Sequence, residues 1–184
     1  MRKLVITENI TLDGSIEMLD DWFDPEEQGN QSDLTAELRR QDQDADAFLV
    51  GRQTFTDLRS YWPHQTDDPT GIGEYLDQVQ KYVVSSTLTE PEWEPTTILS
   101  GDPVEAVADL KESDGQDIVC TGSITLVHTL IGAGLVDELR LLVYPAVQGR
   151  GRRLFPDGHR AEAMALLEAR VFASGVTLLR YATT

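Results

Sequence analysis

Short apolar runs alternate with longer segments of mixed polarity along most of the chain. The runs that have the length and composition of buried strands are residues 3–10, 47–50, 81–85, 96–99, 118–120 and 138–144. In segments 32–40 and 124–131, apolar residues recur three or four positions apart, which is typical of helices. Strands that alternate with helices predict an α/β fold with a mostly parallel central sheet and flanking helices.

Helix start signals support this pattern. Ser32 is a favourable N-cap, and Asp102 is followed by Pro103 and Glu105, a combination that begins many helices. A further helix is expected to start directly after Gly51, where strand 47–50 ends.

The clearest unit lies between residues 117 and 151. Strand 118–120 runs into Gly122-Ser123, a helix follows that Gly132 terminates, and strand 138–144 comes next. A strand–helix–strand unit of this kind places its two strands parallel in one sheet.

The last part of the chain has a different pattern. Two alternating runs within residues 165–182 flank Ser174-Gly175, which predicts an antiparallel C-terminal hairpin. Polar residues predict a loop at 64–74, and a long loop is expected at 11–31. Since no repeat or linker separates these elements, we expect a single domain over residues 1–184.

The composition excludes several classes of protein. Forty per cent of the 184 residues are hydrophobic, which excludes a disordered chain and suits one sizeable core. No apolar run is long enough to span a membrane, and the N-terminus is too short and too β-like for a signal peptide. A single cysteine agrees with a reducing compartment, so we expect a cytoplasmic protein without a disulfide framework.

The charge is strongly negative, with a formal net value of −17 at pH 7. Such a surface repels nucleic acid and anionic membranes, so neither is an expected partner, and a nucleotide site would need its own arginines. Lysines number three among the 15 basic residues, a composition typical of proteins that stay soluble in strong salt. A GC-rich genome is the alternative explanation, and we favour the salt-adapted source.

Three predicted strands end in glycine or hydroxyl residues. Gly51, Ser85-Ser86 and Gly122-Ser123 follow strands that should be parallel, so these residues are expected at one edge of the sheet. Helix N-termini at this edge would present unpaired N–H groups to a phosphate. The alternative interpretation is that each segment is only a tight turn with a capping side chain.

Other chemistries are not indicated. His64, His128 and His159 have no helical spacing to an acidic or cysteine ligand, so no metal site is expected. Cys120 ends a buried strand, where a packed thiol is commoner than a nucleophile. Arg150, Arg152 and Arg153 either bind an anion or neutralise nearby acidic residues.

Taken in order, several segments resemble the dihydrofolate-reductase-like superfamily, specifically the C-terminal reductase domain of the bifunctional riboflavin-biosynthesis protein. The matching segments are 11–14 (TLDG), 49–55 (LVGRQTF), 85–88 (SSTL), 121–123 (TGS), 134–139 (GLVDEL), Pro145 with Gly149 and Gly151, and 175–181 (GVTLLRY). They span nearly the whole chain, although the deaminase half of that protein has no counterpart here.

The resemblance implies NADPH binding. The cofactor-binding positions that it implies are Gly51, Arg52, Thr54, Ser85, Ser86, Gly122, Ser123 and Ile124. The chain departs from the family where Gly122-Ser123 replaces a Gly-Gly pair, and a serine can still donate from its backbone and hydroxyl.

The resemblance also implies a substrate side. The residues expected to border the nicotinamide and substrate are Asn9, Thr11, Ile16 and Trp22, with the loop 11–31 as a cover. Asp33 falls near the family's catalytic acid, although it could be only a first-turn acid favoured by the helix dipole. Asp13 and Glu17 are rival acids.

The function expected from the resemblance is the NADPH-dependent reduction of a pterin, pyrimidine or related small heterocycle by hydride transfer. Dihydrofolate reductase proper and a non-catalytic nucleotide-binding module are the alternatives. By analogy with the family we expect a homodimer.

Overall fold

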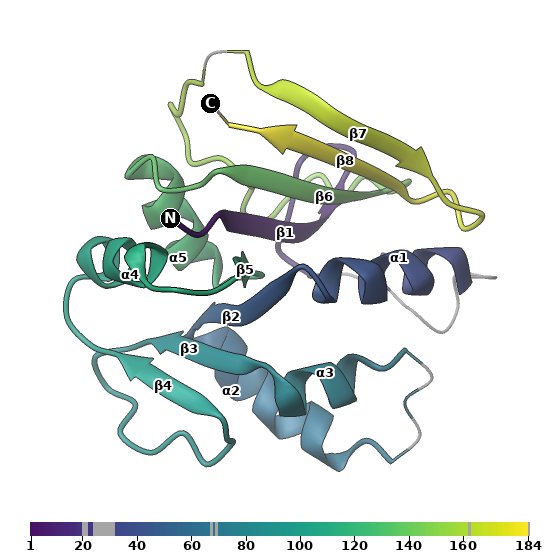
Figure 1. Ribbon diagram of the computed structural model, residues 1–184. Helices are drawn as coiled ribbons and strands as arrows, with labels where there is room; N and C mark the ends of the chain where they lie inside the picture. Colours follow the sequence, from purple (N-terminus) through teal and green to yellow (C-terminus); the bar gives the residue numbers. More distant parts are fainter. Residues whose placement is uncertain (20–21, 24–31, 67, 69, 162, 184) are drawn as a thin grey trace.

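A computed structural model describes residues 1–184 except 20–21, 24–31, 67, 69, 162 and 184 (Figure 1). Eight strands form one sheet in the described chain. The strands are β1 (Leu4–Thr11), β2 (Ala45–Gly51), β3 (Gln80–Val84), β4 (Thr96–Leu99), β5 (Asp117–Cys120), β6 (Glu138–Tyr144), β7 (Ala165–Val171) and β8 (Thr177–Ala182). The helices are α1 (Ser32–Asp42), α2 (Arg52–Tyr61), α3 (Ile72–Gln78), α4 (Pro103–Glu112) and α5 (Ile124–Gly132), with a 3-10 turn η1 (Trp62–His64).

The strand order is β4-β3-β2-β5-β1-β6-β8-β7. Neighbours from β4 to β6 are parallel, whereas β8 pairs antiparallel with both β6 and β7. This arrangement confirms the predicted α/β fold, with its mostly parallel sheet and antiparallel C-terminal pair.

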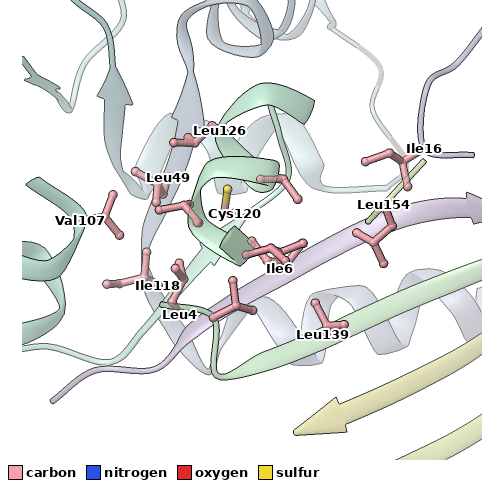
Figure 2. Packing of buried hydrophobic residues seen from close by; sticks show 14 of the residues in the cluster. Leu4, Ile6, Ile16, Leu49, Val107, Ile118, Cys120, Leu126, Leu139 and Leu154 are labelled. Carbon is pink, nitrogen blue, oxygen red and sulfur yellow. The ribbon is translucent and has the colours of Figure 1, made fainter. Parts of the chain in front are cut away.

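Successive side chains of each strand point to opposite faces of the sheet. Because both faces carry apolar side chains, helices cover both of them. Leu49 of β2 packs with α4 and α5, whereas its neighbour Val50 packs with α2 and α3. Figure 2 shows the first of these cores, in which side chains from β1, β2, β5 and α5 surround Cys120. Helix α1 covers the other half of the second face, where Leu34 packs on Leu142 and Leu178.

Several predicted boundaries are confirmed. Strands β4 and β6 have the predicted bounds, and Asp102 caps α4 by accepting from the N–H groups of Val104 and Glu105 at 2.9 and 3.1 Å. The predicted strand at 81–85 begins one residue earlier, at Gln80.

The prediction of a polar loop over 64–74 was wrong at its end, because α3 begins at Ile72. Asp68 provides the start signal, since its carboxylate accepts from the N–H of Gly73 at 2.8 Å. Gly71 makes the turn between them with a φ of 78°. The capping acid lies four residues before the helix, which is too far for the usual sequence signature.

No helix among the described residues has the length and apolar character needed to cross a membrane. Within the same residues, His, Cys, Asp and Glu side chains form no group of three that is suited to a metal ion.

Candidate active site

The ends of β3, β2 and β5 meet at one edge of the sheet, as predicted. These strands are parallel neighbours, and Gly51 pairs with Val84, the residue before Ser85. The N–H of Gly51 donates to the carbonyl oxygen of Gly122 at 3.2 Å. The turns after β2 and β5 are therefore in direct contact.

Glycine is required at both turns. A Cβ on Gly51 would overlap the Oγ of Ser123. Gly122 has a φ of 114°, which side chains rarely adopt, and a Cβ there would lie 3.0 Å from Oγ1 of Thr54. Gly122 and Ser123 are joined by a cis peptide bond. The structure thus brings Gly51, Thr54, Gly122 and Ser123 together.

Two helices begin at this junction without a side-chain cap. Neither Gly51 before α2 nor Ser123 before α5 provides a capping hydrogen bond, in contrast to Asp102 before α4. The first N–H groups of α2 and α5, at the positive ends of their helix dipoles, are suited to an anion. Backbone N–H groups at a helix start are a place where phosphate groups bind readily.

Arg52 adds the positive charge at this edge. Its side chain is exposed and makes no ion pair with any residue that the structure describes. Ser86 is also exposed, whereas the buried hydroxyl of Ser85 accepts from the N–H groups of Thr87 and Leu88 at 3.2 and 2.9 Å. Ser86 therefore remains available to a ligand, while Ser85 shapes the turn.

Beside the junction, a cleft of about 190 Å³ separates α1 from the sheet. Its lining includes Thr7, Asn9, Phe23, Leu38, Asp42, Thr121 and Tyr144. Asn9 thus lines the cleft together with Thr121, which follows β5, and its contact with a substrate stays a prediction. A more open hollow of about 370 Å³ lies between η1 and α3, and it contains none of the predicted site residues.

Asp42 is an acidic residue of this cleft that was not predicted from the sequence. Burial raises the pKa of its carboxyl to about 6, although Arg140 opposes the shift. Tyr75 also interacts electrostatically with Asp42. The Oη of Tyr75 and the Nη1 of Arg140 are buried without hydrogen-bond partners in the described part of the chain.

Asp33 lies outside the residues that line the cleft. One of its oxygens accepts from the N–H of Leu34, and the other accepts from the N–H of Ala173, both at 2.9 Å. Asp33 therefore ties the start of α1 to the β7–β8 connection. Its catalytic role stays a prediction.

The other expected substrate residues are not among those that line the cleft, and their role stays a prediction. Thr11 is buried and donates to Asp13, and Ile16 packs in the core near Leu154 (Figure 2). Trp22 packs edge-on against Tyr144, with ring centroids 5.4 Å apart, and its Nε1 donates to Gln148. Of the loop 11–31, residues 20–21 and 24–31 lie outside the described residues.

The rival acids have structural partners. Hydrogen bonds from Thr11 and from the backbone of Gly149 hold the pKa of Asp13 at about 2. Glu17 pairs with Arg152 at 2.6 Å, so Arg152 neutralises a local acid. Cys120 is fully buried, as expected of a packed thiol, and this burial raises the pKa of its thiol to about 12.

Comparisons with known proteins show the family of this chain. The family model described as the RibD C-terminal domain matches residues 2–178. YyaP of Bacillus subtilis (strain 168), an uncharacterized protein, is 30% identical over 185 residues, which cover 98% of this chain and 94% of YyaP.

Solved structures show the same fold. A pyrimidine reductase-like protein from Corynebacterium diphtheriae matches with a TM-score of 0.66 at 16% identity, over 100% of this chain and 92% of that one. The diaminohydroxyphosphoribosylaminopyrimidine deaminase/5-amino-6-(5-phosphoribosylamino)uracil reductase of Thermotoga maritima matches with a TM-score of 0.67 at 13% identity. That match covers 100% of this chain and 57% of the longer protein.

Proposed function

The chain belongs to the RibD C-terminal domain family, and from this premise we propose that it is an NADPH-dependent reductase of a small heterocyclic molecule. The observation that most supports this function is the meeting of two uncapped helix starts at Gly51 and Gly122-Ser123, beside the cleft under α1. A dinucleotide cofactor needs such a phosphate site, and its reactive ring needs an adjoining space for the substrate.

We assign the cofactor contacts as follows. The N–H groups that follow Gly51 and Ser123 bind the diphosphate, with Thr54 and Ile124 beside them. Arg52 and Ser86 bind the additional phosphate that distinguishes NADPH from NADH, because an arginine makes charge-assisted hydrogen bonds to phosphate. In a chain of net charge −17, a local cation is needed to hold this anion.

The cleft under α1 holds the substrate in this proposal. When bound, NADPH supplies a hydride to a C=N or C=O carbon. Phe23 and Tyr144 line the cleft, and Trp22 packs on Tyr144, so these rings limit the access of water. A volume of about 190 Å³ is below the roughly 300–1,000 Å³ of most ligand pockets, which favours a compact ring system.

Asp42 delivers the proton that the substrate's heteroatom needs. It lines the cleft, and a pKa of about 6 keeps part of the carboxyl protonated near neutral pH. Asp33, the acid implied by the family resemblance, is the matched control for Asp42. Its two oxygens already accept backbone N–H groups, so Asp33 is engaged in holding the fold.

The test is NADPH oxidation, followed by absorbance, across dihydrofolate, the pyrimidine intermediates of riboflavin synthesis, and small pterin or quinonoid compounds. We expect turnover of a pyrimidine or another compact heterocycle, lost in Asp42→Asn and retained in Asp33→Asn. Turnover of dihydrofolate that is lost in Asp33→Asn would instead identify a dihydrofolate reductase. NADPH binding without oxidation of any compound would indicate a nucleotide-binding module.

We also propose that the chain forms a homodimer through β7. This strand is at the edge of the sheet, and its Leu166, Leu167 and Val171 are 57%, 51% and 73% exposed. An apolar edge strand is a template for another strand, and a second copy related by a two-fold axis would pair with it. Light scattering should give a dimer for the wild type and for the control Leu12→Lys, but a monomer for Leu167→Lys. A monomeric wild type would contradict the proposal.

A further inference from the structure

Glu8 interrupts an otherwise apolar face of β1. Side chains two residues apart point to the same face of a strand, and Leu4, Ile6 and Ile10 all belong to the core beneath α4 and α5. Figure 2 shows Leu4 and Ile6 in this core, close to Cys120. Glu8 occupies the same face and is 7% exposed. A carboxyl at such a position is uncommon unless it is paired.

The carboxyl of Glu8 makes no ion pair with any residue that the structure describes. Its Oε1 has no hydrogen-bond partner in the described part of the chain. Burial alone raises its pKa, to about 8, and no cation opposes the shift. Glu8 interacts electrostatically with the thiol of Cys120 on β5, which stays neutral, and it lies opposite the apolar Leu141 on β6. A buried carboxyl without a countercharge holds its proton at neutral pH.

The position of Glu8 relates it to the candidate active site. The last paired residues of β1 and β5 are Ile6 and Cys120, and Glu8 comes two residues later on β1, past the end of β5. The Sγ of Cys120 donates to the carbonyl oxygen of Gly122 at 3.6 Å, so Cys120 connects Glu8 with the turn.

The order of the strands gives the direction of the cofactor. Ser86 follows β3, the phosphate site lies between β2 and β5, and the next strand is β1. We place the adenosine end of the dinucleotide near Ser86 and its diphosphate at Gly122. The nicotinamide end then reaches β1, the next strand in the sheet. Glu8 and Asn9 then lie on the two faces of β1 at that end, Glu8 toward α5 and Asn9 toward the cleft.

We infer that Glu8 senses the oxidation state of the nicotinamide ring, staying protonated beside the uncharged reduced ring and ionising beside the positively charged oxidised ring. This inference rests on the proposed function. When the oxidised cofactor binds, the O–H bond of the Glu8 carboxyl breaks heterolytically. The electron pair stays on the carboxylate, the proton passes to water, and no group is oxidised or reduced. The carboxylate then has the countercharge that the core does not provide.

The first experiment measures the dissociation constants of NADP⁺ and NADPH between pH 6.5 and 9 by fluorescence titration. Any pH effect that is common to the binding of both cofactors, such as titration of their phosphate groups, cancels in the ratio of the two dissociation constants. We expect the preference for NADP⁺ to rise roughly tenfold per pH unit and to level off above pH 8. In Glu8→Gln the ratio should not change with pH, whereas the control Glu112→Gln, on the exposed end of α4, should behave like the wild type.

A second measurement needs no variant. Calorimetry at pH 7, in buffers of different ionisation enthalpy, should show the release of about one proton when NADP⁺ binds and none when NADPH binds. It also tests the inference if Glu8→Gln fails to fold.

The outcomes separate this inference from the function on which it rests. If both cofactors bind with a pH-independent ratio and without proton release, Glu8 has no such role, while the proposed function remains. A pH-dependent ratio that persists in folded Glu8→Gln also overturns the inference. If neither cofactor binds the wild type, the proposed function and this inference are both wrong.

Discussion

The sheet has one edge where its parallel strands begin and one where they end, and charged groups differ between these two edges. At the edge where the parallel strands begin, the described basic side chains meet acids. The pairs are Arg2 with Asp46, Lys111 with Asp137, Arg140 with Glu138, and Arg180 with Glu138. At the edge where these strands end, α2 and α5 start without side-chain caps, Arg52 has no ion pair in the described chain, and Glu8 is buried without a countercharge.

The difference shows which groups serve the fold and which remain for a ligand. Asp137 illustrates the first kind, because its Oδ2 accepts both from Lys111 at 2.6 Å and from the N–H of Leu4 at 2.7 Å. Polar groups satisfied inside the protein add stability, whereas groups left unsatisfied cost stability and can bind something else. Substitutions at the first edge should therefore change stability, and substitutions at the second edge should change binding.

The largest effect is expected from Glu138→Gln. Glu138 is 1% exposed and accepts from Nε of both Arg140 and Arg180 at 2.8 Å. The substitution leaves the buried guanidinium of Arg140 short of negative charge, which should cost about 3–5 kcal/mol of unfolding free energy, measured in urea.

The matched control is Glu168→Gln, which removes the more exposed partner of Arg180 at 3.1 Å. It should cost less than about 1 kcal/mol. If both variants lost the same unfolding free energy, burial of an ion pair would not determine how much the pair contributes to stability.

Arg52→Ala should give the next largest effect. It should weaken the binding of NADPH without changing the stability of the fold. Loss of a charge-assisted hydrogen bond, about 1.5–3 kcal/mol, should weaken NADPH binding by roughly ten- to a hundredfold. NADH affinity and the melting temperature should be unchanged, because Arg52 is exposed and makes no ion pair with any described residue. Arg160→Ala removes the same charge from another exposed site and is the control. Equal affinities for NADPH and NADH in the wild type would contradict this assignment.

The carboxyls of the two edges should also differ in their pH dependence. The pKa of Glu8 is about 8 in the folded protein and near 4.3 when unfolded, so the folded state binds more protons between these values. Its contribution therefore makes stability fall as pH rises from about 4.5 to 8, by up to about 1.4 kcal/mol per unit.

Glu138 should show the opposite dependence. Burial favours its neutral form, but hydrogen bonds from Arg140 and Arg180 outweigh burial and lower its pKa. Its contribution is lost only as pH falls below about 4.5. Urea unfolding of wild type and Glu8→Gln from pH 5 to 9 separates these effects, since Asp42 titrates in both proteins. Parallel curves would mean that Glu8 does not hold a proton in the folded state.

The smallest effect concerns salt. The exposed acidic residues repel one another, and screening at about 0.1 M salt already acts over roughly 10 Å. The buried pairs of the first edge are screened much less. The melting temperature should therefore rise by a few degrees between low and high sodium chloride. A flat or falling curve would remove the argument for a salt-adapted protein.

The sequence predicted the elements whose signals are local. Strand β6 and helix α4 follow from an apolar run and from an adjacent cap, and the common edge of Gly51 and Gly122 follows from the rule that parallel strands end together. Helix α3 was missed because Asp68, which starts it, is separated from it in sequence.

The acids of the site depend on contacts that are distant in sequence. Asp42 is at the end of α1. It shares the cleft with Thr70 and Ile72 and interacts electrostatically with Tyr75, all from another part of the chain. Nothing near Asp42 in the sequence signals this. Glu8 did leave a signal, because strict alternation through Ile6 and Ile10 already places it on a buried face.

The position of β1 in the sheet has a consequence for folding during synthesis. Strand β1 is synthesised before its two partners β5 and β6, which end at Cys120 and Tyr144. Strands β2, β3 and β4 can pair with one another much earlier. The nascent chain must therefore keep the apolar Val5 and Ile6 from aggregating until more than a hundred further residues have been made.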